Sequence, residues 1–253
     1  MLVPRYWLSK QRLQLALANY PIYDPPHKTE ERLLPIEKAL DNFHYFMRVR
    51  HDRIHFFRTW LSDRFGVNTS FEKEGIEDTL NWVDAYVPII MPYQNFSQTS
   101  VVFKGYARQW SGEYAGANAF FDLGAMLGET IIHHRPDLRW QLEWSLEDYP
   151  SVEKTLPRET MILLRSRERD VREAKREKYS GYRRPLLASA YGPLGYEPVY
   201  GMISTHFLIV SQRVAIDHAI RNLSVPGGLR TGNRDYLRAW IHRALIPPIR
   251  IQN

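Results

Sequence analysis

A nearly all-apolar stretch in the middle of the chain constrains the fold more than any other feature. Residues 116–136 have the sequence GANAFFDLGAMLGETIIHHRP. Wound as an α-helix, they carry apolar side chains around most of the circumference, which is typical of a helix inside a domain. Four polar residues interrupt the apolar surface in one narrow line along the helix. They are Asn118, Asp122, Glu129 and His133.

Glycines in and before this stretch predict close packing around the helix. Gly112 and Gly116 are four residues apart, and so are Gly124 and Gly128. Because each glycine in a helix costs about 1 kcal/mol relative to alanine, we expect another backbone to lie close to these positions. We therefore predict that the helix, which should begin near Glu113, is buried in the middle of the domain.

The polar line on this helix has two interpretations. Inside a protein an unpaired polar group costs on the order of 1 to 3 kcal/mol, and a bare charge costs more, so the line needs partners. Asp122, Glu129 and His133 would either line a polar pocket, as metal ligands or as acid and base, or belong to an internal ion-pair network. We favour the network. Candidate arginines for it are Arg108, Arg135 and Arg139.

Hydrophobic periodicity predicts a predominantly helical α+β protein, in which three to four major helices pack with a small, antiparallel sheet. Further helices are predicted at 7–20 and within 29–66, 68–88, 199–223 and 234–248. Strands are predicted at 99–103, 139–144 and 160–165. We expect residues 1–28 to be an N-terminal helix and a proline-rich connector, and residues 29–253 to be a single domain.

Histidines on the predicted long helix raise the possibility of a metal site. His51 and His55 are four residues apart, a spacing that can hold a divalent metal ion. The sequence HDRIH lacks the glutamate of the metalloprotease motif HExxH, and His44 precedes it by seven residues. We favour packing of the three imidazoles at the edge of the core, keep metal binding as the weaker alternative, and predict no cofactor.

The net charge of +6 comes almost entirely from residues 165–184, which contain nine Lys or Arg and four Asp or Glu. This basic segment would bind an acidic protein, or would neutralise phosphates while tyrosines stack on bases. A solvated face is a further alternative. The candidate binding residues of the basic segment are Arg172, Lys175, Arg176, Tyr179, Tyr182, Arg183 and Arg184.

The composition indicates a cytoplasmic protein. The chain has no cysteine, which excludes disulfides, thiolate metal sites and thiol nucleophiles and fits a reducing compartment. The first residues lack a secretory signal pattern, and prolines interrupt the longest uncharged run, 85–103, so we expect a soluble protein without a membrane span.

No motif predicts a particular reaction. The chain contains neither GxSxG nor a phosphate-binding GxxxxGK[ST] loop. With its seven Trp and fifteen Tyr, it fits a non-enzymatic interaction domain that binds another protein, such as an immunity protein, an adaptor or an assembly subunit. The alternative is an enzyme or a ligand-binding protein that uses the polar line, and nucleic-acid binding through 165–184 is the weaker third interpretation.

Overall fold

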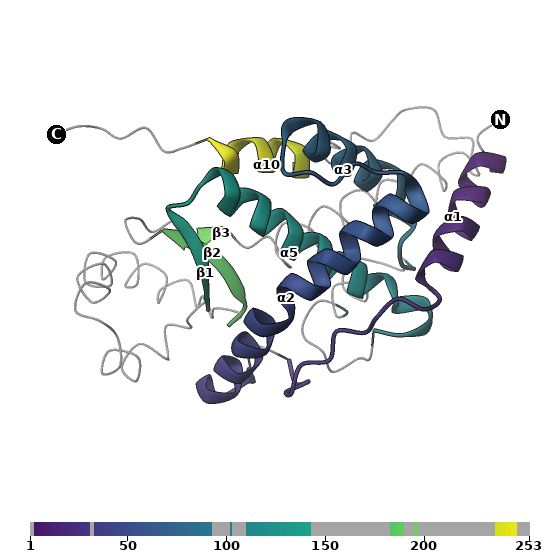
Figure 1. Ribbon diagram of the computed structural model, residues 1–253. Coiled ribbons are helices and arrows are strands. Elements are labelled where there is room, and N and C mark those ends of the chain that lie inside the picture. The colour runs from purple at the N-terminus through teal and green to yellow at the C-terminus, as the bar shows by residue number, and fades with distance from the viewer. Residues whose placement is uncertain are drawn as a thin grey trace, which may run out of the picture.

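The computed structural model describes the chain in several stretches. They are residues 3–30, 33–92, 102, 110–142, 183–189, 195–196 and 236–246. The helices in this part are α1 (Val3–Leu17), α2 (Ile36–Phe65), α3 (Lys73–Tyr86), α5 (Gly116–His134) and α10 (Tyr236–Leu245), with single 3-10 turns at Val87–Ile89 and Gly112–Tyr114. The strands are β1 (Leu138–Leu142), β2 (Pro185–Ser189) and β3 (Gly195–Tyr196). The predicted α+β class, predominantly helical with a small antiparallel sheet, is confirmed (Figure 1).

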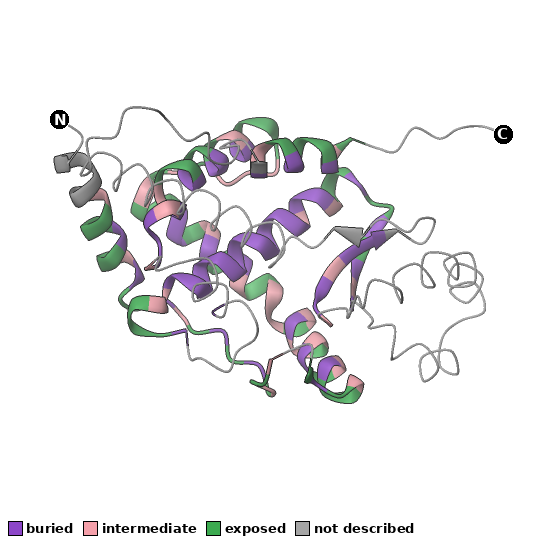
Figure 2. Ribbon diagram, turned by 180° about the vertical axis from the view of Figure 1, so that it is seen from behind, coloured by how far each residue is buried: buried purple, intermediate pink, exposed green. Residues whose placement is uncertain are grey.

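Helix α5 forms the centre of the described fold. Every residue from Gly116 to Gly128 is buried, and Figure 2 shows the helix coloured as buried along most of its length. Helices α2 and α10 and strand β1 all contact it. The predicted interior position is therefore confirmed, and the α-helix begins three residues after the predicted start at Glu113.

The long predicted helix is present as α2, which crosses α5 (Figure 1). Ile54, Phe57 and Leu61 from its apolar stripe are buried in the core. The helix ends at Gly66, which has a left-handed backbone with φ 69° and donates its N–H to the Ser62 carbonyl at 2.8 Å. This ending is common because glycine adopts the left-handed conformation without steric cost, and it confirms the predicted helix end.

The proline-rich segment after α1 lies against this core. Residues 20–27, called the connector below, contain neither helix nor strand, as predicted. The side chains of Tyr20 and Tyr23 are buried, and the Tyr23 ring stacks on Phe121 of α5 with ring centroids 3.8 Å apart. The connector is therefore part of the packed core that surrounds α5.

The sheet is antiparallel in the order β1-β2-β3. In β1, Trp140 and Leu142 are buried and Arg139 is exposed, which confirms the predicted alternation for residues 139–142. Residues 143–144 of the predicted strand lie outside the described part. Leu142 pairs with Pro185 at one end of the β1–β2 ladder, so the two ends of residues 143–184 lie side by side. The strands predicted at 99–103 and 160–165 and the helix predicted at 199–223 fall outside the described residues, apart from Val102.

The glycines before and in α5 have different roles. A Cβ atom added at Gly116 would lie 2.3 Å from the backbone oxygen of Ile90, which confirms the close backbone approach predicted there. At Gly112 the prediction of close packing is wrong. A Cβ atom would meet nothing within 4 Å there, and the residue has φ 59°, a left-handed conformation that favours glycine in the turn before α5.

We predict that Gly116→Ala lowers the free energy of unfolding by about 1–3 kcal/mol, because the methyl group forces the Ile90 backbone away from α5. An unobstructed helical position would instead gain about 1 kcal/mol from the same substitution. Urea denaturation followed by tryptophan fluorescence measures the change. Thr59→Ala, at an exposed position of α2, is the control for helix propensity, and a Gly116→Ala protein more stable than wild type would contradict the prediction.

Candidate functional site

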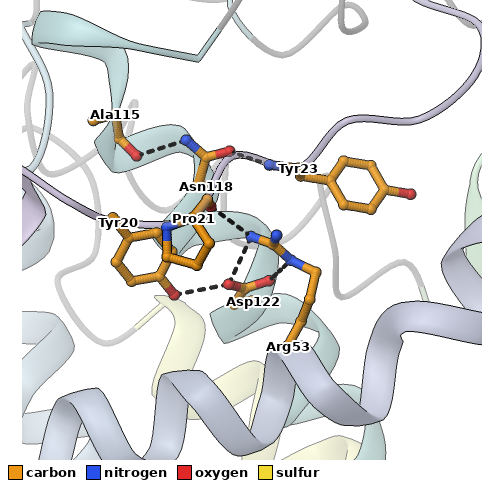
Figure 3. A network of polar contacts seen from close by, with 7 residues as sticks. All are labelled: Tyr20, Pro21, Tyr23, Arg53, Ala115, Asn118 and Asp122. Atoms are coloured by element: carbon orange, nitrogen blue, oxygen red, sulfur yellow. Dashed lines mark hydrogen bonds and ion pairs between the residues drawn. The ribbon is translucent and has the colours of Figure 1, made fainter.

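The carboxylate of Asp122, in the middle of α5, is bonded at both oxygens. Its side chain is 0% exposed. Arg53 of α2 donates from Nε to one oxygen at 2.6 Å and from Nη2 to the other at 2.9 Å (Figure 3). The Tyr20 hydroxyl of the connector donates to the second oxygen at 2.7 Å. The buried charge is thus neutralised by a two-point ion pair and a further hydrogen bond.

Arg53 also holds the connector. Its Nη2 group donates to the Pro21 carbonyl at 3.2 Å, and its guanidinium carbon lies 5.4 Å from the centre of the Tyr23 ring. One guanidinium therefore contacts α5 and the connector while it extends from α2 (Figure 3).

Asn118, one turn before Asp122, is satisfied by backbone groups. Its side-chain oxygen accepts a hydrogen bond from the Tyr23 N–H at 2.7 Å. Its side-chain nitrogen donates to the carbonyls of Trp110 at 2.7 Å and Ala115 at 3.1 Å. Because Asn118 is fully buried, these bonds offset its desolvation and fix the connector beside the start of α5.

Glu129 lies toward the other end of α5 and has separate partners. One carboxylate oxygen accepts hydrogen bonds from Arg50 Nε at 3.0 Å and from the indole N–H of Trp140 at 2.8 Å. The Glu129 side chain is 18% exposed. This second ion pair links α5 to α2 and to β1.

His133 does not belong to this network. Its side chain is 51% exposed, and its Nε2 lies 4.0 Å from an oxygen of the exposed Glu72. Its ring lies 5.3 Å from the ring of Phe71. The structure therefore buries Asn118 and Asp122, partly buries Glu129 and leaves His133 at the surface, which corrects the expected four-residue polar line.

The geometry matches the internal ion-pair alternative, but two of the three expected arginines are wrong. Arg135 pairs with Asp137 at 2.8 Å, and Arg139 is exposed. Arg108 lies outside the described residues. The carboxylates are instead paired by Arg53 and Arg50, which come from α2, far away in the sequence.

Burial dominates the protonation equilibrium of Asp122. It raises the pKa of this carboxyl group to about 6, although the Arg53 charge and the hydrogen bonds from Arg53 and Tyr20 act in the opposite direction. Burial and the neighbouring Asp122 charge also raise the pKa of the Tyr20 hydroxyl well above its ordinary value. Tyr20 therefore stays protonated at neutral pH and remains a hydrogen-bond donor.

The histidines of α2 lie at the surface. His44, His51 and His55 are all exposed. The His44 ring lies 6.3 Å from the ring of Phe43, which packs against the core. His51 and His55 have no such contact among the described residues, so the expected packing at the core edge is wrong for these two. The reason is the orientation of α2, which turns Ile54 and Phe57 inward. Within the described residues, no group of three or more His, Cys, Asp or Glu side chains is placed to hold a metal ion.

Only the end of the basic segment is described. Arg183 has φ 53° and donates a hydrogen bond to the Leu34 carbonyl, just before α2. Arg184, at the start of the sheet, is only 5% exposed. The remaining candidate binding residues lie outside the described part of the chain. They are Arg172, Lys175, Arg176, Tyr179 and Tyr182.

The raised pKa of Asp122 predicts how stability depends on pH. Between the ordinary carboxyl pKa of about 4 and the folded value of about 6, the folded protein binds a proton that the unfolded chain does not. The stabilisation of the folded state by this proton is fully present below pH 4 and is lost as the pH rises through 6. The stability of wild type relative to Asp122→Asn should therefore fall by on the order of 3 kcal/mol from pH 4 to pH 7.

Urea denaturation at several pH values tests this prediction. Asp63→Asn, at an exposed position of α2, is the matched control, and its difference from wild type should lack this trend. A relative stability of wild type that rises between pH 4 and pH 7 would mean that attraction to Arg53 outweighs burial.

Comparison with protein-family models, with curated proteins and with solved structures gives no match to this chain. Among the helices that the structure describes, none has an apolar stretch of the length needed to cross a bilayer. The case for a function therefore rests on the side-chain arrangement and the charge distribution.

Proposed function

We propose that this protein is a non-enzymatic interaction domain that binds another protein, as an immunity protein, an adaptor or an assembly subunit does. The observation that supports this most is that the Asp122 carboxylate is inaccessible to a ligand. Both of its oxygens are bonded to protein groups, and its side chain has no exposed surface. A substrate or a metal ion would have to displace Arg53 to reach it, so the polar line serves the fold and the function belongs to the surface.

The partner-binding region in this proposal is the basic segment 165–184. Leu142 and Pro185 are paired, so the two residues that flank 143–184 lie together at one end of the sheet. In the proposal, a partner binds this segment without separating α2 from α5. The excess of nine basic over four acidic residues favours an acidic partner, because complementary charge speeds association and disfavours partners of like charge.

An apolar residue lies next to the described end of this segment. Leu33 is 63% exposed, and the carbonyl of the following residue, Leu34, accepts the hydrogen bond from Arg183. An exposed apolar side chain beside a basic segment has the composition of many interfaces, in which an apolar centre is surrounded by charged groups. In the proposal Leu33 contributes to the apolar centre of the interface. The cytoplasm, a reducing compartment, is the proposed location, since the chain has no cysteine.

Affinity purification from a native lysate tests the function. We expect wild type to recover one protein in stoichiometric amount. The triple variant Arg172→Glu/Lys175→Glu/Arg176→Glu should lose most of that protein, because the charge of the binding segment is reversed. A control with the same change in net charge is Lys10→Glu/Lys38→Glu/Lys73→Glu, which alters exposed lysines on α1, α2 and α3. This control should recover the partner as wild type does.

Two outcomes would contradict the proposal. One is that wild type recovers no stoichiometric protein partner. The other is that the partner is a nucleic acid, which would appear as salt-sensitive retention on an oligonucleotide column that the basic-segment variant loses and the control keeps.

A further inference from the structure

We infer that His51 and His55 form a binding site for a divalent transition-metal ion on the exposed face of α2. Both side chains are exposed. Neither imidazole has a hydrogen bond, an ion pair or a ring contact with any residue in the described part of the chain. By contrast, the imidazole of His27 is bonded to Asp41 at 3.0 Å, and that of His134 contacts the Phe71 carbonyl at 2.7 Å. The ring nitrogens of the pair are thus available to a metal ion.

The spacing of the two histidines on the helix is one that allows both to bind the same metal ion. Residues four apart on an α-helix lie one above the other, with Cβ atoms about 5–6 Å apart. The zinc-binding helix of HExxH proteases uses two histidines at this same spacing. His51 and His55 lie in the interior of α2, which extends from Ile36 to Phe65, so neither belongs to a fraying end.

Packing on the opposite face fixes the direction of the pair. Arg53 is bonded to the buried Asp122, and Ile54 and Phe57 are buried in the core. The helix therefore cannot rotate about its axis without breaking these contacts. The two histidines are held outward before a metal ion arrives, which lowers the entropy that binding has to remove.

The two arginines three residues before and after the pair, Arg48 and Arg58, make contacts with other residues. The guanidinium of Arg48 lies 5.4 Å from the centre of the Tyr45 ring. The guanidinium of Arg58 lies 4.9 Å from the Phe71 ring and donates to the Thr69 hydroxyl at 3.3 Å. Asp52, exposed between the two histidines in sequence, adds a negative charge that favours a cation.

The ligand chemistry selects the class of metal. Imidazole nitrogen suits zinc, nickel and copper, whereas magnesium and calcium prefer oxygen. The site provides two protein ligands, because no group of three metal-binding side chains is found among the described residues. Water completes the coordination, and copper(II) should bind most tightly.

Isothermal titration of the full chain with nickel chloride at pH 7.5 tests the inference. We expect wild type to bind nickel, and either His51→Ala or His55→Ala to weaken that binding by about tenfold or more, because each leaves a single ligand. The matched control is His44→Ala, an exposed histidine of the same helix without a histidine four residues away. It should bind as wild type does, and magnesium chloride should give no binding to any of the proteins.

Three results would overturn the inference. Wild type that binds no nickel shows that the pair does not chelate. Unchanged binding in His51→Ala and His55→Ala places any site elsewhere in the chain. An equal loss in His44→Ala shows that the effect does not depend on the paired spacing. Circular dichroism of each variant confirms that α2 remains folded, so that a loss of binding is not a loss of the helix.

Discussion

The arrangement of the described core depends on the buried charge of Asp122. A carboxylate without contact to water has to be paired, since leaving it bare would cost several kcal/mol. Arg53 meets this need from α2, and Tyr20 meets it from the connector, 69 and 102 positions away in the chain. One side chain of α5 thereby determines where two distant segments lie. Nearer the two ends of the helix, Asn118 binds the connector and Glu129 binds α2 in the same way.

Much of the fold could be predicted from local sequence patterns. Residues 116–134 are apolar around most of the helix circumference, and this predicted their burial. The spacing of apolar residues predicted α2, and Gly66 predicted where α2 ends. The need for partners on Asp122 and Glu129 followed from the same burial, but the identity of the partners did not, because it depends on how two helices cross. A usable signal was present in Arg50 and Arg53, which lie three or four residues from Met47, Ile54 and Phe57 of the apolar stripe and therefore next to it on the helix surface.

Other features depend on contacts that a local pattern does not contain. Strand β2, with the sequence PLLAS, has no apolar–polar alternation, and it is a strand because it pairs with β1. His133 follows Glu129 by one turn, yet it lies near the end of α5, where the helix leaves the core. The described interior is thus occupied by structural contacts. In the proposed account, partner binding is assigned to the basic segment 165–184, which lies between β1 and β2 in the sequence.

A double-mutant cycle at pH 8 tests the central claim most directly. At that pH Asp122 is ionised, and its coupling to Arg53 should be at full strength. We expect Arg53→Met to lose about 3–5 kcal/mol of unfolding free energy, because it leaves the Asp122 carboxylate buried and unpaired. Asp122→Asn should lose less, because at this pH it also removes the cost of burying a charge. The double variant should lose clearly less than the sum of the two. Additive losses, or an Arg53→Met loss below about 0.5 kcal/mol, would show that this ion pair does not hold the core together.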